Sequence, residues 1–228
     1  QPNSIDLTPS PNVATYNLVM DAHLALGNAS RVQDMMFEMM NTANDPPVSP
    51  NSESFSKVIR AYLNKELDKR NYGIPGEHLE IAFSWLKELV KREESGNSEL
   101  GPAPDLFSTV LKTAARTTAR GENILDIAVW TFHALEASRF QTDYQAYVWM
   151  LEIVLKVLSS RDDAEIQAEN ITQIFQQCCN DGVLSSSFVT KLTTGLFYDA
   201  GWTKEVADQL CKELWGNPPS FNPVWSRE

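Results

Sequence analysis

The chain has 228 residues, of which 43% are hydrophobic and 21% are charged, and its formal net charge at pH 7 is -11. This composition is that of an ordinary soluble protein that can bury a substantial core. Apolar runs such as residues 153–155 are far shorter than the roughly 20 residues that span a bilayer, so we expect no membrane insertion. An acidic balance ordinarily argues against a nucleic-acid partner, because phosphate binding depends on Lys and Arg.

The start of the chain and its cysteines bear on location. The sequence begins at Gln1 with no Met and no charged, apolar leader, so we expect that a targeting peptide has been removed or that the chain is part of a longer protein. Two of the three cysteines, Cys178 and Cys179, are adjacent and cannot pair in a relaxed geometry inside a helix. The sequence therefore predicts a reducing compartment.

The first predicted elements are an N-terminal extension at 1–10 and a helical hairpin at 11–49. Asn12 is a candidate N-cap, and apolar residues recur at helical spacing after it until Gly27 ends the helix. A second helix is expected at about 30–40, where apolar residues again fall on one side.

Three further hairpins are predicted along the chain, at 50–103, 104–141 and 142–180. The second contains two stretches that are polar and rich in Gly, Asn and charge, which indicates inserted loops near 64–76 and 93–103.

The C-terminal part is expected to hold a degenerate capping pair of helices at 181–215 and a tail at 216–228 that contains Pro and Trp. The prolines exclude a helix in the tail. No segment of the chain shows the strict alternation of a strand, so the predicted fold class is all-α.

An aromatic anchor recurs near the start of each predicted hairpin. The anchors are Tyr16, Phe55, Phe107, Tyr147 and Phe188. Their steps of 39, 52, 40 and 41 residues, with helical patterning inside each unit, predict stacked helical hairpins rather than a single globular core.

Several segments resemble the pentatricopeptide repeat, a pattern with Pro-Asp or Pro-Asn, Thr-Tyr-Asn, an apolar run, Gly and then Ala-x3-Phe-x2-Met. They are PNVATYNLVMDAHLALGNASRVQDMMFEMM, PNSESFSKVIRAYL, PDLFSTVLKTAA and AVWTFHALEA. The resemblance covers about four units over residues 11–180. It implies a right-handed α-α superhelix (a helical-hairpin solenoid) and single-stranded RNA binding along the first helices, in a chloroplast or mitochondrion.

The resemblance also implies which residues read bases. In that family one reading residue follows the aromatic anchor, and the other is the Asp or Asn after the Pro that ends the repeat. The pairs in this chain are Asn17 with Asn51, Ser56 with Asp105 and Ser108 with Asp143. Family usage implies a pyrimidine followed by two guanines, and Val148 at the fourth anchor cannot hydrogen-bond a base.

Charge is distributed unevenly in a way that bears on RNA. The predicted first helices hold nine basic and six acidic residues, whereas the whole chain holds 19 basic and 30 acidic ones. Arg116 and Lys156 fall nine residues after their anchors, where the family tends to place a phosphate contact. The expected phosphate contacts are Lys57, Arg60, Lys112, Arg116 and Lys156. We expect weak, salt-sensitive binding from these few cations, which equally suit a solvated helix face.

A structural interpretation of the reading residues stays open beside the functional one. Asn51, Asp105 and Asp143 each stand where a helix begins, and Asp or Asn is favoured there because its side chain satisfies free backbone N–H groups.

The sequence predicts no enzyme, cofactor or metal. The three histidines lie in different units without metal-ligand spacing, and there is no phosphate-cradling glycine loop or nucleophile-base set. Two functions remain: an organellar RNA-binding module for RNA processing, stability or translation, and a protein-protein interaction scaffold or subunit of a larger assembly. The scaffold is favoured by the acidic surface, the inserted loops and the aromatic tail with Phe221 and Trp225. We prefer RNA binding narrowly, because of the family resemblance.

Overall fold

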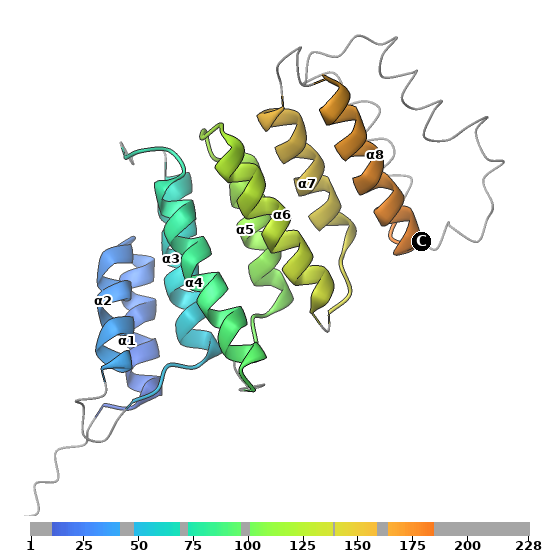
Figure 1. Ribbon diagram of the computed structural model, residues 1–228. Helices are drawn as coiled ribbons and strands as arrows, with labels where there is room; N and C mark the ends of the chain where they lie inside the picture. Colours follow the sequence, from blue (N-terminus) through green and yellow to red (C-terminus); the bar gives the residue numbers. More distant parts are fainter. Residues whose placement is uncertain are drawn as a thin grey trace, which may run out of the picture. The chain divides into compact units, whose positions relative to one another are not determined.

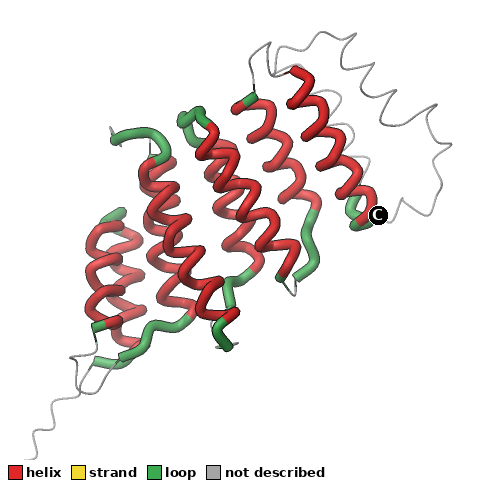
Figure 2. The backbone as a smooth tube through the Cα atoms, viewed as in Figure 1, coloured by secondary structure: helices red, strands yellow, loops and turns green. Residues whose placement is uncertain are grey.

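The computed structural model of the protein describes residues 11–41, 48–68, 73–96, 101–138, 140–158 and 164–184. All regular structure in these ranges is helical, in eight helices, and Figure 2 shows no strand among them. The all-α class is therefore confirmed for the described part of the chain. The predicted extension at 1–10, the tail at 216–228 and nearly all of the capping pair at 181–215 lie outside the described residues.

Tertiary contacts divide the chain into two compact units, Gln1–Leu106 and Phe107–Glu228. The helices of the first unit are α1 Val13–Ala25, α2 Ala29–Met40, α3 Ser52–Leu67 and α4 Glu77–Glu94. The remaining helices are α5 Pro104–Arg116, which begins just before the second unit, α6 Glu122–Ala137, α7 Tyr144–Val157 and α8 Ala164–Asn180. Consecutive helices within each unit run antiparallel (Figure 1).

The boundaries of α1 follow from its flanking residues. The side chain of Asn12 accepts a hydrogen bond from the Thr15 backbone N–H at 3.0 Å, which satisfies one of the free donors of the first turn. After the helix, Gly27 has a φ of +72°, a left-handed conformation that glycine adopts without steric cost. Both predicted ends of this helix are confirmed.

The core of the first unit forms where α3 packs against α1, α2 and α4. The anchor Phe55 is fully buried, and its ring lies 6.0 Å from that of Trp85 in an edge-on contact. Trp85 in turn contacts Phe37 with a centroid separation of 5.5 Å. Burial of an aromatic side chain of this size contributes up to about 3 kcal/mol to folding.

The second unit has the same kind of core around its anchors. Phe107 and Tyr147 are both buried, and the Tyr147 ring meets Phe132 edge-on at 5.0 Å. The Tyr147 hydroxyl donates to Asp181, and burial together with this carboxylate raises the pKa of the phenol above its ordinary value. Packing thus explains the aromatic residue at three of the five anchors, Phe55, Phe107 and Tyr147, whereas Tyr16 is only half-buried and Phe188 lies outside the described residues.

Two predicted loops begin too early in the sequence. Helix α3 continues to Leu67 and α4 continues to Glu94, so the first residues of 64–76 and of 93–103 are helical. Exposed polar residues with straight side chains prolong a helix rather than end it. No helix of the described ranges is long and apolar enough to cross a membrane.

Candidate nucleic-acid interface

The structure brings the first predicted base-reading pair together. The Asn17 side-chain amide donates to the Asn51 side-chain oxygen at 3.2 Å and to Glu53 at 3.2 Å, while its own oxygen accepts from the Ser54 hydroxyl at 2.7 Å. Only 4% of Asn17 is exposed. Both polar groups of this amide are therefore already hydrogen-bonded within the protein.

Asn51 and Asp143 act as helix caps, as the structural interpretation predicts. Asn51 accepts from the Ser54 backbone N–H at 3.0 Å, and the Ser54 hydroxyl accepts in return from the Asn51 N–H, which completes a capping box. Asp143 accepts from the Ala146 N–H at 3.0 Å at the start of α7. The capping role of these two residues is confirmed.

The second predicted pair is engaged in other contacts. The Ser56 hydroxyl donates to the Ser52 carbonyl of its own helix at 2.8 Å. Asp105, in the first turn of α5, forms an ion pair with Arg60. A residue expected to read a base and a residue expected to hold a phosphate thus neutralise each other.

The third predicted pair is divided between α5 and the start of α7. Ser108 is half-buried on α5, while the Asp143 carboxylate caps α7, and no hydrogen bond joins these two described residues.

On α3, the predicted phosphate contact Lys57 is enclosed by carboxylates. Its ammonium lies 2.5 Å from Asp21 and 2.9 Å from Glu53, and only 9% of the residue is exposed. Burial alone would lower the pKa of Lys57, but the hydrogen bonds to Asp21 and Glu53 outweigh it and raise the pKa above its ordinary value. The positive charge on this helix is therefore compensated inside the first unit.

On α5, the predicted phosphate contacts are exposed. Ser108, Lys112 and Arg116 follow one another at intervals of four residues, so they form a stripe along one side of the helix, which we call the α5 stripe. Lys112 and Arg116 have no carboxylate partner among the residues that the structure describes, and the same holds for Arg120 just beyond the helix. Within the described ranges, the cations of the α5 stripe are therefore not paired with carboxylates.

Two side chains of α7 meet the C-terminal end of α5. The Arg116 guanidinium carbon lies 5.4 Å from the centre of the Trp149 ring, in a cation-π contact. The Lys156 ammonium donates to the carbonyls of Ala114, Ala115 and Thr117, the last two at 3.2 Å each. These three bonds use all three N–H donors of Lys156.

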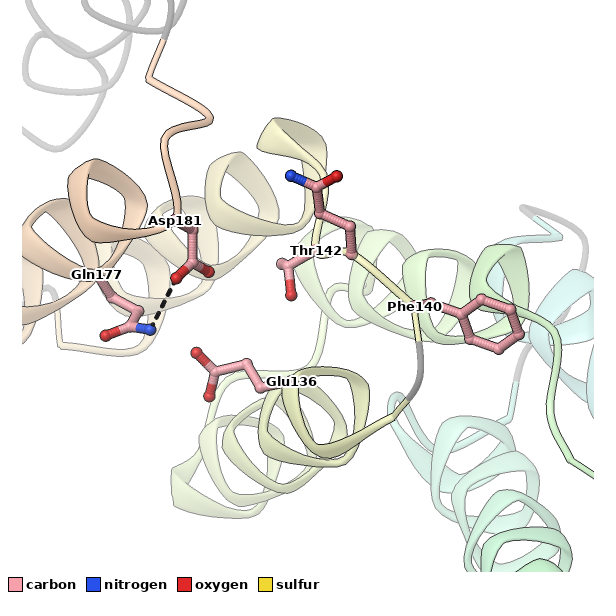
Figure 3. A pocket seen from close by; sticks show the side chains of 6 residues that line it. Glu136, Phe140, Thr142, Gln177 and Asp181 are labelled. Atoms are coloured by element: carbon pink, nitrogen blue, oxygen red, sulfur yellow. Dashed lines mark hydrogen bonds between the residues drawn. The ribbon is translucent and has the colours of Figure 1, made fainter. Parts of the chain in front are cut away.

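A polar pocket of about 500 Å³ lies in the second unit (Figure 3). Its lining consists of Glu136, Phe140, Gln141, Thr142, Gln177 and Asp181. The Gln177 amide donates to the Asp181 carboxylate at 3.1 Å, and the lining includes a second carboxylate, that of Glu136. Such a lining repels phosphate groups, so the pocket is unsuited to RNA. Within the described ranges, no group of three or more His, Cys, Asp or Glu residues is placed to hold a metal ion.

No protein-family model matches the chain, and a comparison with curated proteins finds no match.

Asp21, Glu53 and Trp149 contact predicted site residues but were not themselves predicted. Glu53 stands four residues before Lys57, and this spacing was an available signal for an ion pair on a helix. Asp21 and Trp149 gave no such local signal, because each contacts a side chain of another helix.

Proposed function

We propose that the protein is a non-catalytic repeat protein of the pentatricopeptide type, with its hairpins in a right-handed superhelix, and that it binds single-stranded RNA in an organelle. The observation that carries this proposal is the α5 stripe, in which Lys112 and Arg116 are exposed and uncompensated by described carboxylates. Cations in this state are free to exchange counterions for RNA phosphates. The Ser108 hydroxyl in the same stripe can donate to or accept from a base edge.

The charge of the whole chain sets the strength of this binding. A net charge of -11 repels RNA, so only a few local cations oppose a general repulsion. We therefore expect weak binding that falls steeply as salt concentration rises.

The test is fluorescence anisotropy of a short labelled single-stranded RNA of mixed sequence, titrated with the protein at moderate salt. The double variant Lys112→Glu with Arg116→Glu should bind at least about tenfold more weakly than the wild type. A matched control is Lys87→Glu with Lys91→Glu, which makes the same charge change at exposed positions of α4.

The α4 variant distinguishes binding at the α5 stripe from a general dependence of RNA affinity on net charge. We expect the α4 variant to stay close to the wild type, because α4 is the second helix of its hairpin and the proposed RNA path follows the first helices. Equal losses in both double variants would show that charge alone governs binding, and unchanged affinity in the α5 variant would remove RNA binding from the α5 stripe.

A second candidate function is protein docking through α1, and an exposed apolar surface favours it. Leu18 and Leu26 are 71% and 72% exposed. Ala14, one turn before Leu18, and Ala22, between the two leucines, are also exposed. The exposed side of α1 is mostly apolar, and an exposed apolar surface of this kind is typical of a contact with another protein.

The packing of α3 on α1 indicates what fits this surface. Glu53 and Lys57, two residues before and after Phe55, are among the α3 residues that contact α1. The matching positions around Tyr16 are Ala14 and Leu18, which are exposed. If a partner packs on these positions of α1 as α1 packs on α3, the exposed surface of α1 suits a helical hairpin of a partner protein with apolar residues on its contacting edge.

Quantitative affinity purification after ribonuclease treatment tests this second function. Leu18→Glu with Leu26→Glu should lose protein partners that the wild type retains. Ile74→Glu, at a loop position that is also 72% exposed, is the control and should retain them. Identical partner sets for all three proteins would exclude docking through α1.

A further inference from the structure

The contact between Arg116 and Trp149 supports an inference that rests on the proposed RNA binding and refines it. We propose that Trp149 and Lys156 are positioning residues, which hold the Arg116 guanidinium ready for an RNA phosphate. Neither is itself a phosphate contact.

Trp149 can hold a guanidinium without consuming its hydrogen-bonding capacity. The contact joins the guanidinium, with its carbon 5.4 Å from the ring centre, to the face of a half-buried indole. The attraction comes from the ring quadrupole, so the N–H donors of Arg116 stay available for phosphate oxygens. A planar guanidinium held in this way can bind a phosphate with two parallel hydrogen bonds.

Lys156 fixes the piece of backbone that carries Arg116. The carbonyls of Ala114 and Ala115 lie in the last turn of α5, where helix carbonyls lack intrahelical partners, and Thr117 follows the helix. An ammonium at this end also interacts favourably with the helix dipole. Since Trp149 and Lys156 both belong to α7, one helix fixes both the backbone and the side chain of the Arg116 site.

The other arginines with described ion pairs are in a different state. Arg31 lies near Asp34 and Glu38, Arg60 pairs with Asp105, and Arg92 pairs with Glu88 at 2.7 Å. Each of these pairs must be broken, or its charge opposed, before a phosphate can bind. Arg116 combines an aromatic support with the absence of a carboxylate partner in the described part of the chain.

Holding Arg116 in place should increase affinity by lowering the entropy that its side chain loses on binding. A free arginine side chain samples many rotamers, and ordering them opposes association. Removing the aromatic support should therefore weaken RNA binding by about two- to fivefold, which corresponds to the strength of an exposed cation-π contact.

A double-mutant cycle on the full protein tests the inference. RNA affinity is measured by anisotropy for the wild type, Trp149→Leu, Arg116→Gln and the double variant, together with Trp149→Tyr. We expect Trp149→Leu to weaken binding in the wild type and to have no further effect once Arg116 is Gln. Trp149→Tyr, which keeps a ring face for the cation, should restore most of the affinity.

The results distinguish a failure of the positioning role of Trp149 from a failure of RNA binding itself. If the wild type binds RNA and Trp149→Leu weakens binding equally in both backgrounds, Trp149 has a general structural role and the inference is wrong. Unchanged binding by Trp149→Leu also overturns it. If the wild type binds no RNA, the proposed function fails and the inference fails with it. Thermal unfolding of each variant identifies any loss that is due to misfolding.

Discussion

Helices α3 and α5 occupy matching places in the repeat pattern but differ in the state of their cations. On α3, Lys57 is bonded to two carboxylates and Arg60 to a third. On α5, Lys112 and Arg116 have no carboxylate partner among the described residues. A repeat pattern thus places a basic residue on a helix, while the neighbouring helices decide whether its charge is available to a ligand.

The two helices share a buried aromatic anchor, and its loss should cost more stability than any other change considered below. The anchors Phe55 and Phe107 are both buried in apolar cores. Replacing either with Ala should lower the free energy of unfolding by about 3–5 kcal/mol, because the change removes apolar contact and leaves a cavity. Urea unfolding followed by circular dichroism measures the loss. A cost below about 1 kcal/mol for either residue would contradict equal roles for the anchors.

Removing a lysine should destabilise the protein more on α3 than on α5. Lys57→Met removes an ammonium from Asp21 and Glu53, which are more than half exposed and can regain water, so the loss should be about 1 kcal/mol. Lys112→Met removes an exposed cation and should change stability by less than about 0.5 kcal/mol. The same urea experiment compares them. Equal losses would show that the cation on α5 is also engaged.

The hydrophobic pattern was sufficient to predict most of what builds the helices. Apolar spacing predicted helices around the anchors Phe55, Phe107 and Tyr147, which the structure buries, and the residue types at 12, 51 and 143 predicted the caps. These features depend on residues within one turn of one another. Two loop starts were placed too early, because polar composition by itself does not end a helix.

The partners of the charged residues could not be predicted in this way. Lys57 meets Asp21 from 36 positions away, and Arg60 meets Asp105 from 45 positions away. Lys156 bonds to backbone carbonyls of another helix, which carry no sequence signal. Such contacts depend on how helices pack side by side, and a spacing rule within one helix does not contain that information.

A smaller loss of stability is expected at low pH, from a buried histidine of the first unit. His78 is buried against Tyr62, and its Nδ1 has no hydrogen-bond partner in the described structure. Burial, followed by the charge of Lys65, lowers the pKa of His78 below its ordinary value of 6.5, although Glu66 and Glu77 act in the opposite direction. The unfolded chain then binds a proton more readily than the folded one. Stability should therefore fall as pH drops below 6.5, toward the lowered pKa.

Urea midpoints at pH 7 and pH 5.5 measure this loss, with His78→Phe as the comparison. The variant should lose less stability than the wild type over this interval, since it removes the titrating group. The same loss in both proteins would assign the acid sensitivity to other residues.

We propose that α5 offers RNA cations without a described carboxylate partner and that α3 does not. The salt dependence of RNA affinity distinguishes the two helices, in a comparison of the double variant Lys112→Gln with Arg116→Gln on α5 and the double variant Lys57→Gln with Arg60→Gln on α3. Each phosphate contact to a single strand contributes about 0.7 to the slope of log affinity against log salt. We predict a slope shallower by about 1.4 for the α5 variant and an unchanged slope for the α3 variant. A reduction in the α3 variant equal to or larger than that in the α5 variant would contradict the claim.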